Sequence, residues 1–326
     1  MLTVTVADED LYGRLADMAA RPGSDRVEVI LWDLTTDLPD DVADRVDMVC
    51  IGHYFSGADK WQRIANLPNL RVLQIPSAGF EHALPYTPPG VILCNGRGIH
   101  SAATSELALA LTLASQRGLA ESWDAQRQST WLPFDVPALA GRRVLVVGAG
   151  SVALAVRRRL LPFEVEVTMV GRTARTVVDN EDPARAGGVG DDVDVQAIGS
   201  LLDLLACHDI TILTVPSDAS TRHLMDAAAL AAMPDGALLV NVARGPVVDT
   251  DALVAEVAAG RLRVALDVTD PEPLPEDHPL WTTANTLITA HLGGRTDSVY
   301  PRTAALVRRQ IEHLLAAEPL ENVVNN

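Results

Sequence analysis

The sequence contains few residues of several kinds, and each shortage narrows what the protein can be. Only 3 of its 326 residues are cysteines, and only 4% are aromatic. Cys50, Cys94 and Cys207 are odd in number, lie far apart in apolar runs and lack the spacing of a disulfide or metal site. We therefore expect three buried, reduced thiols, no metal site and a cytoplasmic location.

Positive charge is also scarce. The chain has 26 basic residues against 43 acidic ones, a net charge of −17, and Lys60 is its single lysine. Nucleic acid and anionic membranes would repel such a chain, so we expect neither as a partner. No apolar run approaches the roughly 18 residues of a membrane span, and the first residues do not resemble a signal peptide.

The length and the 48% apolar content are sufficient for two domains with sizeable cores. In the first hundred residues, short β-branched runs alternate with amphipathic stretches at 8–21 and 58–68, which predicts strands, helices and a parallel sheet. The predicted strands are 2–7, 27–32, 46–52, 70–75 and 90–95.

A long apolar helix is predicted at 101–120, followed by an irregular segment at 121–140. Strand–helix alternation then restarts, which predicts a second α/β unit, and an amphipathic helix is expected at 297–317. The acidic, glycine-rich segment 178–194 is predicted to be a surface loop. The further strands are expected at 142–150, 164–171, 208–215, 236–243, 263–268 and 286–291.

Residues 144–153, VLVVGAGSVA, predict a strand, a tight glycine turn and the start of a helix. Gly148 permits the turn, and Gly150 lets a pyrophosphate approach backbone N–H groups at the helix N-terminus. Ala153 occupies the third position of the fingerprint, where the residue packs the helix on the strand. A tight turn without a ligand is the alternative, but the strand that follows at the correct distance favours a dinucleotide site.

The end of that following strand bears on which dinucleotide binds. A carboxylate that binds the ribose of NAD is expected about 20 residues after the glycines. The sequence has Gly171 there, followed by Arg172, Thr173 and Arg175, with no acidic residue before Asp179. Because guanidinium groups bind phosphate, we predict a preference for NADPH, with NADH possible; solvated arginines are the alternative.

Three later motifs each place polar residues after an apolar strand: NVARGPVVDTDAL (241–253), LDVTDPEPLPEDHPLW (266–281) and ITAHLGG (288–294). With GAGSVA, these motifs occur in the order and spacing typical of the D-isomer-specific 2-hydroxyacid dehydrogenase family, which the chain resembles from about residue 70 onward. The resemblance implies two doubly wound α/β domains with a cleft between them: a discontinuous flavodoxin-like substrate domain (1–99 plus 293–326) and a Rossmann NAD(P)-binding domain (100–292).

The resemblance also assigns catalytic roles, which the chemistry of the side chains supports. His291 would give the substrate carbonyl its proton, since a histidine ordinarily titrates near neutral pH. Glu272 would accept a hydrogen bond from the other ring nitrogen, and Arg244 would clamp the substrate carboxylate with its planar fork. Ala290 stands where the family usually has proline, which leaves the reacting groups unchanged.

The first domain is expected to supply Ser77, Ala78 and Gly79, in a loop that resembles the family's carboxylate-binding loop, and Tyr54 or His53 beside the substrate. The long helix and the tryptophan-bearing segment after it resemble the family's dimer contact, which implies a homodimer. The residues expected to contact the cofactor are Gly148, Ala149, Gly150, Ser151, Val152, Arg172, Thr173, Arg175, Val215, Pro216, Val242, Ala243, Asp267, His291 and Gly293.

These features predict reversible reduction of a 2-keto acid to a D-2-hydroxy acid, with a nicotinamide cofactor as the hydride donor. Two alternatives remain open. The first is a dinucleotide-binding regulatory protein with little turnover, resembling a corepressor of the family. The second is a dehydrogenase of another small anion, such as formate or phosphite. The sequence does not identify the acid.

Overall fold

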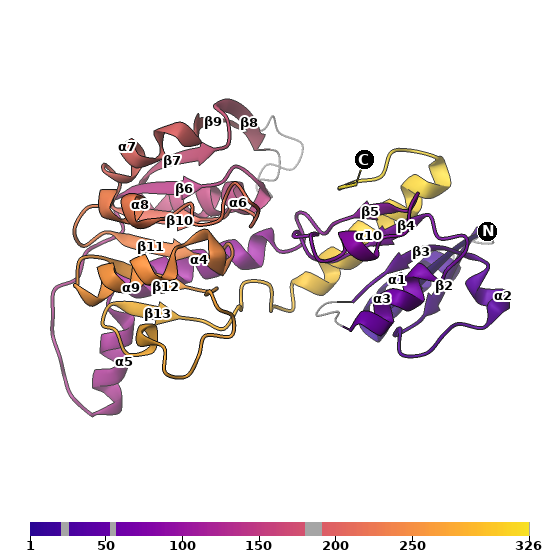
Figure 1. Cartoon of the computed structure of the whole chain (residues 1–326), viewed down its shortest axis with the longest axis horizontal. Coiled ribbons are helices and arrows are strands. Elements are labelled where there is room, and N and C mark those ends of the chain that lie inside the picture. The colour runs from indigo at the N-terminus through magenta and orange to yellow at the C-terminus, as the bar shows by residue number, and fades with distance from the viewer. Residues whose placement is uncertain (21–25, 53–56, 180–190, 326) are drawn as a thin grey trace. The chain divides into compact units, whose positions relative to one another are not determined.

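The structure is a computed structural model that describes residues 1–20, 26–52, 57–179 and 191–325. The chain divides into two compact units (Figure 1). The first comprises Met1–His100 and Thr296–Asn326, and the second comprises Ser101–Arg295.

The first unit contains five parallel strands in the order β2-β1-β3-β4-β5. This is the strand order of flavodoxin-like doubly wound folds, so the predicted architecture of this sheet is confirmed. The strands are shorter than the apolar runs that predicted them: β1 (Leu2–Val6), β2 (Val27–Leu31), β3 (Val46–Cys50), β4 (Val72–Gln74) and β5 (Ile92–Cys94).

Helices cover both faces of this sheet. Successive residues of a strand point to opposite faces, so neighbours in β3 pack against different helices. Met48 and Cys50 pack in a core cluster with α1 (Glu9–Ala20) and α10 (Val299–Ala316). Val49 packs in a second cluster with α3 (Ala58–Ala65), while the short helix α2 (Asp40–Ala43) buries no side chain.

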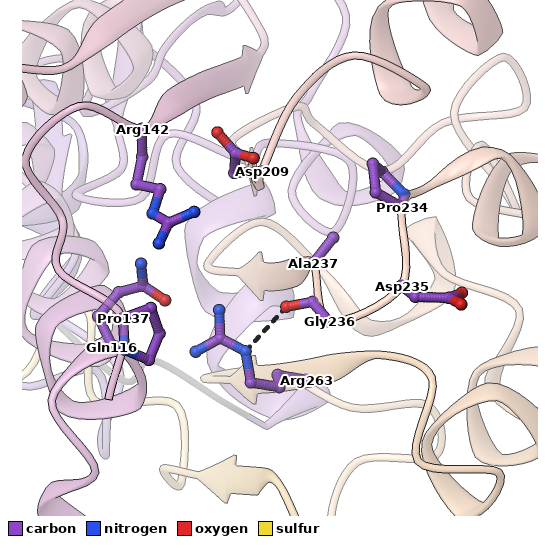
Figure 2. A pocket seen from close by; sticks show the side chains of 9 residues that line it. All are labelled: Gln116, Pro137, Arg142, Asp209, Pro234, Asp235, Gly236, Ala237 and Arg263. Carbon is purple, nitrogen blue, oxygen red and sulfur yellow. Dashed lines mark hydrogen bonds between the residues drawn. The ribbon is translucent and has the colours of Figure 1, made fainter. Parts of the chain in front are cut away.

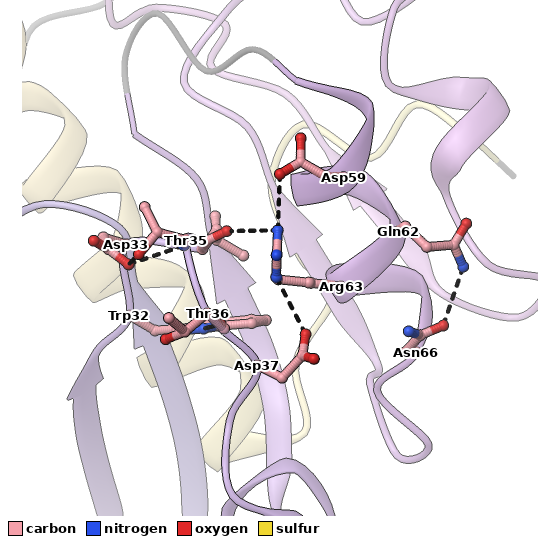
Figure 3. A network of polar contacts seen from close by, with 10 residues as sticks. Trp32, Asp33, Thr35, Thr36, Asp37, Asp59, Gln62, Arg63 and Asn66 are labelled. Atoms are coloured by element: carbon pink, nitrogen blue, oxygen red, sulfur yellow. Dashed lines mark hydrogen bonds and ion pairs between the residues drawn. The ribbon is translucent and has the colours of Figure 1, made fainter.

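Polar contacts tie α3 to the segment after β2 (Figure 3). The Arg63 guanidinium is 3.0 Å from Asp59 on its own helix and 3.1 Å from Asp37 on that segment, and it donates to the Leu34 carbonyl at 3.3 Å. Because the carboxylates of both acids are exposed, the contacts position the segment more than they stabilise it.

The second unit contains an eight-stranded sheet in the order β13-β12-β11-β10-β6-β7-β9-β8. All pairs are parallel except β8 with β9. The strands are β6 (Arg143–Val147), β7 (Glu166–Gly171), β8 (Arg175–Asp179), β9 (Asp191–Ala197), β10 (Ile210–Leu213), β11 (Leu238–Asn241), β12 (Arg263–Leu266) and β13 (Thr286–Ile288).

Two core clusters lie on opposite faces of this sheet. Leu145 and Val147 pack with α7 (Leu201–Leu205), α8 (Ala227–Ala232) and α9 (Thr250–Ala258). Val144 and Val146, their neighbours in β6, pack with α4 (Ser101–Gln116) and α6 (Ser151–Leu160). The predicted doubly wound fold is therefore confirmed for this unit as well.

The acidic segment 178–194 is not a surface loop along its whole length, so that prediction is wrong. Its two ends belong to β8 and β9, which form an antiparallel pair, while residues 180–190 lie outside the described residues. In β9, Val193 and Val195 are buried, whereas Asp194 between them and Asp191 and Asp192 before them are exposed. This alternation is the signal of a half-buried strand, and the acidic composition concealed it.

Two smaller predictions also need correction. The segment 121–140 begins inside a helix, since α5 (Leu119–Arg127) follows a left-handed Gly118 that ends the predicted long helix early. Cys207 is exposed, whereas Cys50 and Cys94 are buried. Cys207 lies in the turn two residues after the end of α7, where an apolar neighbourhood in the sequence does not imply burial.

Candidate functional site

The candidate site lies at the carboxyl edge of the second sheet. Because β6, β7 and β10 to β13 are parallel, the segments that follow them meet at this one edge. From β6 the chain adds β7 and β9 on one side and then returns to add β10 on the other side of β6, which marks the switch point where such sheets bind ligands. The predicted cofactor residues lie on these segments, at positions 148–152, 172, 173, 175, 215, 216, 242, 243, 267, 291 and 293.

The glycine turn after β6 requires its first glycine. Gly148 has a φ of 132°, which side-chain-bearing residues rarely adopt, and its N–H donates to the Val170 carbonyl at 2.8 Å. A Cβ at this position would lie 2.3 Å from Thr214 Oγ1. Gly148 therefore allows the turn to pack against the end of β10.

Gly150 differs, because a Cβ built on it meets nothing within 4 Å and its φ is an ordinary −93°. It is the N-cap of α6, and as a glycine it has no side chain to cap the helix. The space in front of its backbone and the free N–H end of a ten-residue helix fit a pyrophosphate. Ala153 is fully buried in the core, as its packing role requires.

The arginines expected to bind a 2′-phosphate have a competitor that the sequence did not reveal. Arg172 lies 3.5 Å from the carboxylate of Asp218, on the segment after β10. Hydrogen bonds from Ser220 hold the pKa of Asp218 below its ordinary value, so this carboxylate is ionised at neutral pH. No acidic residue precedes Asp179 in this part of the sequence, but the fold brings the carboxylate of Asp218 from a distant segment to Arg172.

The side chain of Arg175 lies near the glycine turn. One of its terminal nitrogens is 3.8 Å from the position of a Cβ built on Gly171, and Ala149 Cβ is 3.4 Å from that same position. Asp179, the first acidic residue in sequence, is buried and paired with Arg158 of α6. Asp179 is therefore buried in an ion pair and does not face the cofactor residues as a free carboxylate.

His291, the predicted proton donor, is in contact with its predicted partner, Glu272. Nδ1 of His291, after β13, is 2.7 Å from Oε1 of Glu272, after β12. Both side chains are close to half exposed, at 43% and 42%. The contact fixes one ring nitrogen on a carboxylate and leaves Nε2 as the nitrogen that can exchange a proton with a ligand.

The backbone around His291 is held by Asp267, the first residue after β12. Asp267 is buried, and its carboxylate accepts hydrogen bonds from Thr289 Oγ1 at 2.6 Å, Leu292 N at 2.7 Å and Gly293 N at 2.9 Å. Its carbonyl accepts a fourth from His291 N. His291 has a left-handed φ of 53°, and these bonds provide the constraint that such a conformation needs.

Arg244 follows β11 and is exposed. Within the described residues its guanidinium bonds only the carbonyl of Ala243, at 2.6 Å, and contacts neither His291 nor Glu272. Sequence reasoning missed Gly245 beside it. A Cβ on Gly245 would lie 1.9 Å from the Thr269 carbonyl oxygen, so only glycine lets the Arg244 segment approach the one that carries Glu272.

In the first unit, the loop Ser77, Ala78 and Gly79 follows β4. The carbonyl oxygens of all three accept hydrogen bonds, from Gly96 N, Asn95 Nδ2 and Ser77 Oγ respectively. Their N–H groups donate none to the described part of the chain. Such N–H groups suit an anion. Tyr54 and His53 lie outside the described residues.

Comparison with known proteins gives the family. Residues 109–293 match the family described as D-isomer specific 2-hydroxyacid dehydrogenase, NAD binding domain. The chain is also 32% identical over 271 residues to a glyoxylate reductase of Thermofilum pendens, covering 79% of this chain and 76% of that enzyme. This chain belongs to the D-isomer specific 2-hydroxyacid dehydrogenase family.

Other members are similar across most of the chain. The glyoxylate/hydroxypyruvate reductase B of Yersinia pestis is 28% identical over 270 residues, which cover 79% of this chain and 78% of that one. The crystal structure of a D-isomer specific 2-hydroxyacid dehydrogenase from Xanthobacter autotrophicus Py2, with NADPH and MES, superposes with a TM-score of 0.76 at 26% identity. That superposition covers 99% of this chain and 98% of the other.

The predicted family and fold class are thereby confirmed, and the family is one of oxidoreductases that act on 2-hydroxyacids with NAD(P). Across residues 1–20, 26–52, 57–179 and 191–325, no group of histidine, cysteine and acidic residues could hold a metal ion. No helix in these ranges is long and apolar enough to cross a membrane.

Proposed function

We propose that this dehydrogenase reduces a small 2-keto acid to the D-2-hydroxy acid, reversibly, and that it prefers NADPH. The observation that carries the proposal is the His291–Glu272 contact of 2.7 Å at the same sheet edge as the Gly148–Gly150 turn. When bound there, the nicotinamide supplies the hydride. The relatives named glyoxylate reductase and hydroxypyruvate reductase favour those two acids as the first substrates to test.

His291 and Glu272 would perform the proton transfer. With Nδ1 directed at Glu272, Nε2 of a protonated His291 can donate to the carbonyl oxygen as it gains negative charge. Glu272 orients the ring and stabilises the imidazolium form, while Asp267 holds the backbone of the turn. The same groups, with His291 as the base, serve the reverse reaction.

In the second unit, Arg244 would bind the substrate carboxylate; the Ser77–Gly79 loop of the first unit is proposed, by itself, as an anion-binding loop. The guanidinium offers a planar fork, of which one nitrogen is bonded to Ala243 O. The carbonyl groups of this loop already accept hydrogen bonds, while its N–H groups donate none within the described chain. We expect Arg244→Ala to raise KM for the acid and to lower kcat; an unchanged KM would remove the carboxylate role.

NADPH preference is supported by Arg172 and Arg175 and by the absence of a carboxylate at Gly171. The neighbour from Xanthobacter was crystallised with NADPH. Asp218 weakens the site that Arg172 offers, because a phosphate must compete with a carboxylate already 3.5 Å away. The preference is therefore expected to be modest.

A homodimer is also proposed. Five large apolar side chains between residues 119 and 134 are exposed, and Trp131 is 95% exposed. Such a concentration is typical of a surface that a partner covers. The residues are Leu119, Trp123, Trp131, Leu132 and Phe134. Sedimentation analysis tests the proposal, and a monomer at micromolar concentration would contradict it.

The main experiment is a substrate panel with both cofactors, followed by absorbance of the reduced nicotinamide. Loss of that absorbance with glyoxylate or hydroxypyruvate supports the proposal. Binding of NADPH without turnover on any 2-keto acid would favour a regulatory protein. Turnover on formate or phosphite alone would favour a dehydrogenase of another small anion. His291→Ala should abolish turnover but retain NADPH binding, which separates a catalytic from a structural role.

A further inference from the structure

A cavity of about 310 Å³ lies in the second unit at the edge of the sheet opposite the glycine turn. Its lining comes from the amino ends of four strands. Arg142 precedes β6, Asp209 precedes β10, Gly236 and Ala237 precede β11, and Arg263 begins β12 (Figure 2). Since the proposed cofactor residues follow the carboxyl ends of these strands, the cavity is a separate site.

Two arginines face this cavity without carboxylate partners. Within the described ranges neither Arg142 nor Arg263 has an acidic group within 4.0 Å, although acidic residues outnumber basic ones in the chain. Arg142 donates through Nε to the Ala138 carbonyl, and Arg263 donates to the carbonyls of Gly236 and Ser115. No hydrogen bond within the described chain uses the terminal nitrogens of Arg142.

The charge of Arg142 also acts on Arg263. Burial lowers the pKa of Arg263 and the positive charge of Arg142 lowers it further, while the negative charge of Glu121 raises it in part. A negative charge placed between them would offset this repulsion. Guanidinium groups with unused N–H donors recognise carboxylate and phosphate oxygens in a planar, bidentate manner.

The acidic residues of the lining are engaged elsewhere. Asp209 accepts a hydrogen bond from the backbone of Arg143 at 2.8 Å and lies 3.8 Å from its side chain. Asp235 lies 3.6 Å from Arg261 and is turned away from the two arginines in Figure 2. Neither of these two carboxylates therefore forms an ion pair with Arg142 or Arg263, and Glu121 acts on Arg263 only through its charge, with no ion pair between them in the described chain.

Gln116, at the end of α4, adds a buried amide oxygen that lacks a hydrogen-bond donor in the described chain. Its Nε2 donates to the Ala138 carbonyl at 3.1 Å, which assigns the other amide atom as the oxygen. That oxygen, Oε1, is buried and accepts no hydrogen bond from the residues that the structure describes. The ends of Gln116, Arg142 and Arg263 are turned toward one another in Figure 2.

We propose that this cavity is a second ligand site, which binds a small dianionic oxyanion carrying an O–H group, with hydrogen phosphate as its simplest member. The two charges of the ligand match Arg142 and Arg263, and its O–H satisfies Gln116 Oε1 after a small rotation of the amide. The volume is at the lower end of the range for ligand pockets, which restricts the site to small molecules. The proposal is independent of the proposed reaction, because it concerns binding alone.

The test is isothermal titration calorimetry of the full chain with inorganic phosphate at pH 7.5, at constant ionic strength set with sodium chloride. We expect a dissociation constant on the order of 1 mM, and one at least tenfold larger for Arg142→Gln. Arg142→Lys, which keeps the charge, should recover part of the affinity. Arg302→Gln removes the same charge from an exposed position in the first unit and should bind like the unmodified protein.

Two further arms locate the bound phosphate. Affinity retained by Arg172→Gln and Gly150→Ala supports the cavity, because those variants alter the proposed cofactor edge. Affinity lost in those two variants but retained in Arg142→Gln would overturn the proposal, as would the absence of binding at 10 mM phosphate. Sulfate has no O–H at this pH and is expected to bind less tightly; equal affinity would contradict the role given to Gln116.

Discussion

Gly148 and Gly150 stand two residues apart, and the structure predicts opposite consequences of replacing each with alanine. Gly148→Ala should destabilise the fold. A left-handed φ of this kind costs an L-residue on the order of 1–3 kcal/mol. The new Cβ would also displace Thr214 Oγ1 from its 2.9 Å hydrogen bond to the Val147 carbonyl, which costs about 1 kcal/mol more.

The expected total is about 2–4 kcal/mol, which corresponds to a fall in Tm of roughly 5–15 °C for a unit of this size. Gly150→Ala should cost less than about 1 kcal/mol, since its Cβ meets nothing and only the cap is affected. Its methyl group would instead occupy the space through which a pyrophosphate approaches the backbone. We expect its Kd for NADPH to rise by about tenfold or more.

Differential scanning calorimetry gives the stability of each variant, and quenching of tryptophan fluorescence gives the affinity for NADPH. Gly199→Ala is the matched control, because its Cβ also meets nothing and the residue lies outside the candidate site. If Gly150→Ala bound NADPH as tightly as this control, the turn would not be the phosphate site. An unchanged Tm for Gly148→Ala would refute the argument from backbone geometry.

The remaining predictions concern the reacting pair, cofactor choice and the thiols. Glu272→Gln should lower kcat about 10- to 100-fold and shift the pH–rate profile, while KM changes little. The reason is that this substitution alters only the partner of His291 Nδ1. A large change in KM with an unaltered pH–rate profile would contradict this role. Asp218→Asn should improve kcat/KM for NADPH about three- to tenfold and leave that for NADH unchanged, since it removes the carboxylate beside the proposed phosphate site. Steady-state kinetics with both cofactors decide this, and an equal gain for NADH would refute it. Of the three thiols, we expect only the exposed Cys207 to react with a disulfide reagent in the native protein at pH 8. Burial raises the pKa of Cys94 to about 12 and that of Cys50 still further. A count of reacted thiols other than one would contradict the described burial.

The sequence predicted most of the strands directly, and its family resemblance predicted the proposed catalytic pair, His291 and Glu272. Apolar runs bounded by turn residues are local signals, and in parallel sheets the residue after each run lies at a common edge. The contact of His291 with Glu272 followed from the family resemblance and could be tested only in three dimensions. The strand pair β8–β9 was missed because its alternating valines are interspersed with aspartates, which composition alone assigns to solvent.

Other features depend on contacts between segments far apart in the chain. Asp218 lies 46 residues from Arg172, so no local pattern could show that a carboxylate stands beside the expected phosphate site. The need for glycine at position 245 arises from the Thr269 carbonyl, which another strand brings within 1.9 Å of a Cβ there. The sequence determined which groups are available for chemistry. The tertiary structure decided which of them are already paired, because pairing depends on distances that only the folded sheet sets.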